Sequence, residues 1–151
     1  MREFATLDEM RGLVGQEVAV SEWVEITQER IGMFADATDD HQWIHVDPER
    51  CERESPFKAP VAHGFLTLSL LSSLFEKSMR MADATMVVNY GTNKVRFPAP
   101  VPVGSRVRAR LTLLKIVDLD DGAQLEWSVV MEREGEAKPV CVAELLLRRY
   151  P

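Results

Sequence analysis

Residues 63–79 read HGFLTLSLLSSLFEKSM, and this stretch decides the fold. Apolar side chains cover nearly every face of a helix drawn over it, which is the pattern of a helix buried in a core. Small hydroxyl residues fill other positions, where they let a sheet or a ligand come close and can bond back to helix carbonyls. We therefore expect a buried helix from Gly64 to about Arg80.

The chain after this helix changes to strand patterns that turn residues separate. Prolines and a glycine divide the first two strands, and Asp-Asp-Gly and Glu-Gly-Glu turns divide the rest. The last three strands should form an antiparallel meander. One central helix with such a sheet predicts an α+β fold in which the sheet wraps about the helix. The expected strands span residues 85–97, 105–117, 124–133 and 139–149.

The chain before this helix shows helix starts. Thr27 can cap a helix whose apolar residues recur three and four apart and which should fray near Asp40. Asp47 and Pro48 fit a cap followed by proline at the first helical position, which predicts a small helix through about Arg53.

Length and composition predict one globular domain over residues 1–151. Hydrophobic residues make up 46% of the chain and charged residues 28%, as in an ordinary protein with a packed core. We find no internal repeat and no linker.

Charge and cysteine usage exclude several classes of protein. Acidic residues outnumber basic ones by 24 to 18, which argues against a nucleic-acid partner. Cys51 and Cys141 fit neither a disulfide framework nor a metal motif, as expected in a reducing compartment. The first residues lack a signal-peptide pattern, and the most apolar stretch is shorter than the ~20 residues of a membrane span. We expect a cytoplasmic protein with no membrane partner.

The densest polar patch is the segment 36–47, which holds two of the three histidines, His41 and His45; the third is His63. Histidine and carboxylate together can bind zinc or iron. No short ligand-spacing motif supports a metal, and the helix break expected near Asp40, with the apolar pair Trp43 and Ile44 between the two histidines, argues against a pair on one helix face. We therefore expect no metal.

An acid/base site needs a carboxylate and an imidazole that converge on the substrate. Asp40 and His45 could meet in a tight turn from a helix end, with Trp43 and Ile44 anchoring the loop in apolar surroundings. Structural roles fit these residue types as well, since Asp40 could cap a turn, His45 could lie on the surface and Trp43 could belong to the core.

A family resemblance favours the catalytic interpretation. The segment FADATDDHQWIHVDP at 34–48, followed by AHGFL at 62–66, resembles the MaoC-like dehydratases, the (R)-specific enoyl-CoA hydratases. NYGTNKVRFPAPV at 89–101 extends the similarity, which covers about residue 26 to the end. The resemblance implies a hot-dog fold, a strongly curved antiparallel sheet around one long helix, assembled as a homodimer.

The family's loop commonly reads Gly-Asp, any residue, Asn-Pro, an aliphatic residue and His. Asp40, Ile44 and His45 match this pattern. A subgroup similar to nodulation protein N carries the Asp-His-Gln-Trp-Ile-His form found here, so we interpret the catalytic pair as intact. The departures are Asp39 for Gly, Gln42 for Asn and Trp43 for Pro.

The resemblance implies addition of water across the C2=C3 bond of a trans-2-enoyl-CoA to give the (R)-3-hydroxyacyl-CoA, or the reverse dehydration. Asp40 and His45 would hold the water, one removing its proton and the other protonating C2, and the sequence leaves these roles open. The backbone N–H of Gly64 at the helix start would stabilise negative charge on the thioester oxygen. No cofactor is implied besides the CoA of the substrate.

Further residues are candidates for substrate binding. His63 could touch the thioester or CoA, although a histidine at a helix start is more often structural. Ser69 and Ser72 could line the acyl pocket or simply allow close packing. The complete set of substrate-binding candidates is His63, Gln42, Ser69, Ser72, Asn93 and Arg96.

Basic residues that could meet the CoA phosphates lie on two expected strands. Lys94 or Arg96 could pair with phosphate oxygens, or belong to a solvated sheet face. Arg106, Arg108 and Arg110 recur every second residue and so share one strand face. We expect that face to meet solvent, with a CoA groove at a dimer edge as the alternative.

Two other functions remain open. Other hot-dog proteins hydrolyse thioesters, so an acyl-CoA thioesterase is one alternative. The altered loop residues Asp39, Gln42 and Trp43 suggest the other, a non-catalytic acyl-CoA-binding subunit.

Overall fold

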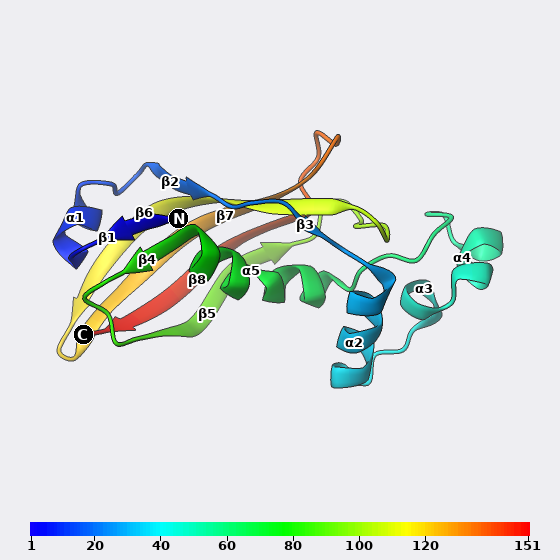
Figure 1. Ribbon diagram of the computed structural model, residues 1–151, viewed down its shortest axis with the longest axis horizontal. Helices are drawn as coiled ribbons and strands as arrows, with labels where there is room; N and C mark the ends of the chain where they lie inside the picture. The colour runs from blue at the N-terminus through cyan, green and yellow to red at the C-terminus, as the bar shows by residue number, and fades with distance from the viewer.

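The computed structural model describes residues 1–151, and its largest element is a curved antiparallel sheet with one long helix beside it (Figure 1). This helix, α5, spans Gly64–Ser78 and packs against the sheet through contacts such as Phe75 on Trp127, whose ring centroids lie 5.2 Å apart. The strands are β1 Arg2–Phe4, β2 Glu17–Val20, β3 Val24–Glu25, β4 Met79–Met81, β5 Met86–Arg96, β6 Arg106–Leu119, β7 Gly122–Arg133 and β8 Cys141–Tyr150.

The sheet has the order β2-β6-β7-β8-β5, with β3 also paired to β6. Strands β6, β7 and β8 form the predicted antiparallel meander. Alternate residues of β7 and β8 are buried, which is the period of two expected for a sheet with one face on the core. Strands β1 and β4 form a separate parallel pair. The α+β fold class predicted from the sequence is confirmed.

Helix α5 differs from its prediction in two ways. It ends at Ser78, where β4 begins, rather than near Arg80. It is also buried on one side only: Leu71 is 2% exposed, whereas Phe65 is 69% exposed and Ser72 is also exposed. The reason is that the sheet of a single chain covers one side of the helix and leaves the other open.

Strand β5 lies at the edge of the sheet and pairs only with β8. Apolar side chains on both faces of this strand are exposed, among them Met86, Val87, Val88 and Tyr90. The register with β8 is irregular at two places, between Asn89 and Gly91 and again further along the strand. The open side of α5 and the open edge of β5 therefore form one uncovered region.

Two of the helices before α5, α2 and α4, begin where the sequence predicts. Thr27 caps α2, and its hydroxyl accepts from the Arg30 N–H at 3.1 Å. Asp47 caps α4, accepting from the Arg50 N–H at 3.0 Å. The short helix α3 was not predicted. Figure 1 shows α2, α3 and α4 gathered at the end of the sheet where α5 begins. These helices are α1 Leu7–Arg11, α2 Gln28–Thr38, α3 Trp43–Val46 and α4 Pro48–Glu54.

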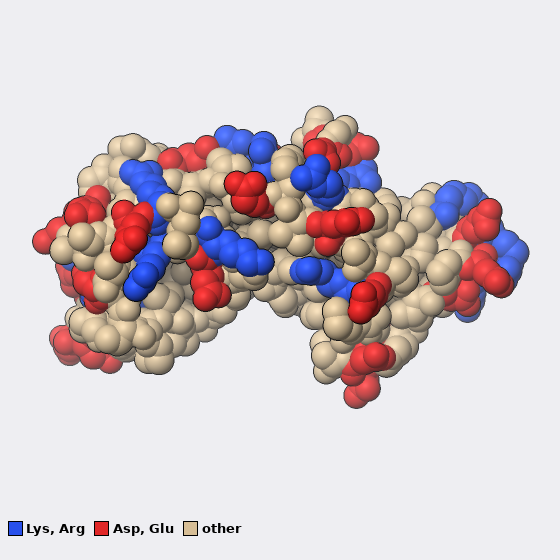
Figure 2. All heavy atoms as spheres, viewed as in Figure 1, with Lys and Arg blue, Asp and Glu red and all other residues tan.

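Basic side chains lie beside acidic ones on the face shown in Figure 2. The three arginines of β6 follow this rule, since Arg106 pairs with Glu134 at 3.0 Å and Arg108 with Glu132 at 2.8 Å. Arg110 likewise pairs with a glutamate, at 2.8 Å. In the single chain these arginines lie on a partly exposed face of the strand, as predicted. No helix combines the length and apolarity needed to cross a membrane.

Candidate active site

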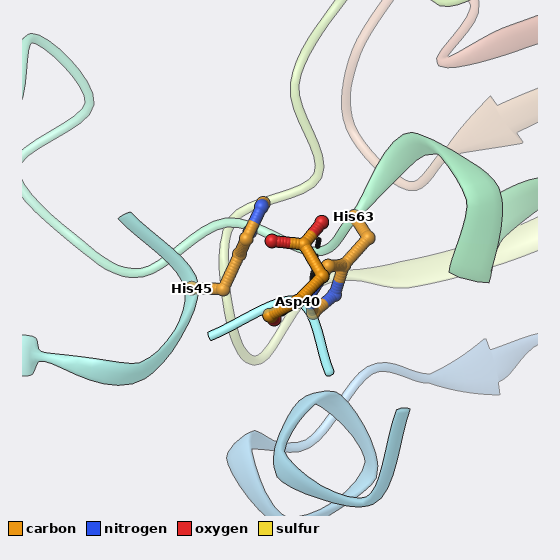
Figure 3. A group of neighbouring side chains, drawn as sticks. All are labelled: Asp40, His45 and His63. Atoms are coloured by element: carbon orange, nitrogen blue, oxygen red, sulfur yellow. Dashed lines mark hydrogen bonds and ion pairs between the residues drawn. The ribbon is translucent and has the colours of Figure 1, made fainter. Parts of the chain in front are cut away.

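Three side chains from three segments converge at the beginning of α5 (Figure 3). Asp40 comes from the loop after α2, His45 from α3, and His63 is the residue before α5. Their carboxylate and ring-nitrogen atoms all lie within 4.8 Å of one another. The structure thus brings together Asp40 and His45, the pair that the sequence singled out, and adds His63.

A left-handed turn directs the chain into the site. Helix α2 ends at Thr38, and Asp39 follows with φ 58°. Aspartate tolerates this conformation better than most side chains, and glycine adopts it freely, which explains why the family pattern commonly has glycine there. Asp40 comes next, and its carboxylate accepts from the backbone N–H of Gln42 at 3.4 Å. Asp39 therefore adopts a backbone conformation that glycine also adopts.

His45 is buried, with 7% of its surface exposed. Its Nδ1 lies 2.6 Å from the Val61 carbonyl oxygen, and because a carbonyl can only accept, Nδ1 carries the hydrogen. The Nε2 lone pair is therefore free. Burial is the main cause that lowers the pKa of His45, the Val61 carbonyl opposes this, and neighbouring His63 lowers the pKa further. A neutral imidazole with a free Nε2 is suited to accept a proton.

His63 contacts both members of the pair. Its side chain is 2% exposed, and its Nε2 lies 2.9 Å from the main-chain oxygen of Asp40. Its ring stacks on the His45 ring, with centroids 3.7 Å apart and planes 23° from parallel. Phe34 of α2 packs against the same ring at 4.9 Å. These contacts make His63 a partner of Asp40 and His45.

A pocket of about 460 Å³ opens at the start of α5. His45, Gly64, Thr67 and Phe97 line it together with apolar residues, whereas His63 does not. Gly64 is the first residue of α5, where backbone N–H groups have no acceptor within the helix. A Cβ on Gly64 would lie 2.8 Å from the Phe97 ring, so glycine is required for this close packing. The His45 imidazole and the start of α5 at Gly64 thus line the same pocket.

The surroundings of Asp40 differ from expectation. Its side chain is 51% exposed, so Trp43 and Ile44 do not enclose it in apolar surroundings. Trp43 instead packs under the Arg50 guanidinium, 4.4 Å from the ring centroid. Ile44 lines the pocket at the start of α5, which Asp40 does not line.

The candidate serines lie in a second hollow. Ser69 and Ser72 line a pocket of about 270 Å³ between α5 and β5, separate from the pocket at the helix start. Ser72 accepts a hydrogen bond from Asn89 at 2.9 Å, and Ser69 donates back to the Phe65 carbonyl at 2.7 Å. Both serines thus make hydrogen bonds within the protein.

The side chains of three further candidates take no part in the site. Asn93 and Arg96 lie on the exposed strand β5 and line neither pocket, and Arg96 donates to its neighbouring carbonyl, that of Val95. Gln42 contributes its backbone, as its N–H bonds to Asp40 and its carbonyl accepts from the His45 N–H at 2.9 Å. Its side chain is exposed.

Asp40, His45 and His63 are also the group in this chain with the right donors for a metal. The stacking of the two rings argues against a shared ion. A nitrogen lone pair lies in the plane of its own ring, so two rings only 23° from parallel and 3.7 Å apart do not aim both lone pairs at one point. The arrangement fits acid/base chemistry better.

Sequence reasoning did not identify Val61 and Phe97 as parts of the site. Val61 acts through its carbonyl, and a backbone group leaves no signal in the sequence. Phe97 did leave one, because it lies within the stretch 89–101 that carries the family resemblance.

Comparisons with known proteins show the family of this chain. The MaoC like domain family matches residues 9–135. 3-Hydroxyacyl-thioester dehydratase Z of Mycobacterium tuberculosis is 51% identical over 149 residues, which cover 98% of each chain. Nodulation protein N of Rhizobium meliloti is 45% identical over 143 residues, 91% of this chain and 87% of that one. The family resemblance seen in the sequence is confirmed.

Solved structures confirm the fold. The (R)-hydratase from A. caviae involved in PHA biosynthesis superposes with a TM-score of 0.74, at 22% identity, over 91% of this chain and 96% of that one. The sheet and helix are thus those of the hot-dog fold. The chain belongs to the MaoC-like domain family and is an enzyme of its hydratase and dehydratase class.

Proposed function

We propose that this protein adds water to a trans-2-enoyl-CoA to give the (R)-3-hydroxyacyl-CoA, or catalyses the reverse dehydration. One observation carries the proposal: His45 and Gly64 line one pocket at the start of α5, and the Asp40 carboxylate lies within 4.8 Å of a ring nitrogen of His45. The name of the M. tuberculosis relative, a 3-hydroxyacyl-thioester dehydratase, supports the same substrate class.

The tautomer of His45 favours it as the base. A water bound between the Asp40 carboxylate and His45 Nε2 would donate to both, and Nε2 would take its proton as the oxygen attacks C3. The imidazolium formed on His45 is then the nearest acid that can protonate C2. In this scheme Asp40 orients the water and stabilises the positive charge on the imidazole.

Negative charge develops on the thioester oxygen while C3 is attacked. An N–H at a helix start is a suitable donor for this charge, because no acceptor within the helix competes for it. Gly64 offers such an N–H in the pocket wall that it shares with His45. We therefore assign the oxyanion-stabilising role to the backbone of Gly64.

The test is loss of the enoyl absorbance when the purified protein is added to crotonyl-CoA or a longer homologue. Asp40→Asn should abolish most of the rate. Asp36→Asn is the matched control, since Asp36 lies outside the site and pairs with exposed His41. Chiral chromatography should give the (R) product. A wild-type rate no higher than that of Asp40→Asn would refute the assignment.

The same preparation separates the alternatives. Release of free thiol from a saturated acyl-CoA would indicate a thioesterase. Binding of acyl-CoA without turnover, unchanged by His45→Ala, would indicate a non-catalytic subunit. The absence of metal, flavin or nicotinamide and a cytoplasmic location remain predictions.

We also propose a homodimer. Phe65 is exposed on the open side of α5, and Met86, Val87 and Val88 are exposed along the unpaired edge strand β5. A second copy would cover them. Sedimentation velocity should show twice the mass of one chain, and a single-chain mass at micromolar concentration would contradict the proposal.

A further inference from the structure

His63 is a buried titratable residue at the site that the proposed mechanism does not use. It contacts no pocket opening, yet it touches both Asp40 and His45. We infer that His63 is a positioning residue that holds the Asp40 loop and the His45 ring at the separation needed to bind one water between them. The inference rests on the proposed function.

The first support is the hold of His63 on the Asp40 loop. The Asp40 carboxylate makes one long bond, 3.4 Å, to the Gln42 N–H. The His63 Nε2 bond to the main-chain oxygen of Asp40 is shorter, 2.9 Å, and comes from the rigid start of α5. This bond connects a loop in a left-handed turn to the longest helix of the protein. Without it, Asp40 would be held to the rest of the site only by its own exposed loop.

The second support is the stacked ring. The Val61 carbonyl fixes one edge of the His45 imidazole, but one hydrogen bond leaves the ring free to tilt about it. His63 covers a face of that imidazole at 3.7 Å, and Phe34 holds His63 from another side. The Nε2 lone pair of His45 is thereby aimed in one direction. Such alignment matters because a displacement of about 1 Å can lower a rate about 100-fold.

The third support is the tautomer that the contacts require. Because the Asp40 main-chain oxygen only accepts, His63 must carry its hydrogen on Nε2. Its Nδ1 is buried and has no hydrogen-bond partner. A hydrogen on Nδ1 would leave a buried donor unpaired and break the bond to Asp40, both unfavourable. The structure thus assigns opposite tautomers to the two stacked rings, Nδ1–H on His45 and Nε2–H on His63.

Three substitutions separate the two contacts. His63→Phe keeps a flat ring and removes the donor, His63→Gln keeps an amide donor and removes the ring, and His63→Ala removes both. We expect His63→Ala to lower kcat about 100-fold with little change in KM, and each of the other variants to recover part of that loss. Ser78→Ala is the matched control, because Ser78 is a buried hydroxyl residue at the far end of α5.

Three results would overturn the inference: a kcat of His63→Ala within about twofold of wild type, a loss confined to KM, or no recovery in either partial variant. A loss confined to KM would mean that His63 touches the substrate. If wild type itself does not hydrate enoyl-CoA, the proposed function fails, and the tautomers remain measurable.

Nitrogen-15 NMR of the histidine rings in the unmodified protein tests the arrangement without turnover or variants. We expect Nε2–H at His63 and Nδ1–H at His45. Nδ1–H at His63 would overturn the inference even if His63→Ala failed to fold. The expected pattern, combined with a full rate for His63→Ala, would also overturn it, since the contact would then exist without a catalytic effect.

Discussion

The charged face of β6 and the site at the start of α5 hold their polar groups in different ways. On β6, Arg106 has a partner of its own, Glu134 at 3.0 Å, and both side chains are half exposed. At the site, His63 serves Asp40 and His45 together, and it is almost completely buried. Groups with separate, hydrated partners can be replaced singly, whereas groups that share a partner act as a unit.

The largest loss of activity is expected at the site, from removal of the proposed base. His45→Ala should lower kcat/KM on the order of 10³-fold, since general acid/base groups contribute roughly 10²–10⁴-fold. Initial rates with crotonyl-CoA measure it. His41→Ala is the control, because His41 is exposed and pairs only with Asp36 at 2.8 Å. Retention of a tenth of the rate by His45→Ala would show that the base lies elsewhere.

Gly64→Ala should reduce kcat about 100-fold, the usual effect of losing one oxyanion donor. The new methyl group would lie 2.8 Å from the Phe97 ring and force either the ring or the helix start to move. Phe97→Leu in the same chain should relieve the contact and restore part of the rate. An unchanged rate in Gly64→Ala would remove the helix start from the mechanism.

The pH dependence should sharpen the contrast between buried and exposed histidines. Burial lowers the pKa of His45 below its ordinary 6.5, so the base stays neutral to lower pH, and the acid limb of kcat/KM should fall below 6.5. In the unfolded chain His45 binds its proton at the ordinary pKa of 6.5, whereas in the folded chain it binds the proton only at lower pH. Stability from His45 should therefore decline as pH falls from 6.5 to the lowered pKa, and remain constant below it.

Exposed His41 provides the opposite case. Its hydrogen bond to Asp36 raises the pKa of His41, so its contribution to stability is present at low pH and is lost as pH rises through the raised pKa. Proton NMR titration of the two rings measures both directions in one experiment. Equal pKa values for His41 and His45 would contradict the burial of His45.

The smallest effect is expected on the sheet. Arg106→Gln breaks the pair with Glu134, and the free energy of unfolding should change by less than about 1 kcal/mol, with kcat unchanged. Urea denaturation and the crotonyl-CoA assay measure the two quantities. A loss of activity would mean that this face takes part in binding CoA.

Local patterns in the sequence predicted much of the fold. The caps at Thr27 and Asp47 and the meander of β6, β7 and β8 depend on neighbours in the chain or on period-two burial, so they were predictable. The open side of α5 was not, because its apolar pattern does not say whether its own sheet or another surface covers each face.

The candidate site was predictable in part. Asp40, His45 and Gly64 could be named from residue types and the family pattern, and the structure brings them to one place. The exposure of Asp40 and the stacking of His63 on His45 depend on how α3 packs against the start of α5. Contacts between segments about 20 residues apart leave no periodic signal in either segment.

The open edge of β5 affects the handling of this protein. Its first part, Met86 to Asn89, pairs regularly with β8 and exposes three consecutive apolar side chains beside unpaired backbone groups, whereas the irregular pairing further along interrupts the edge. An uncovered regular edge recruits strands from other chains. A variant that cannot form the proposed dimer leaves this edge exposed and should therefore precipitate with time and concentration. The turbidity of such a variant should be measured before a loss of activity is attributed to the site.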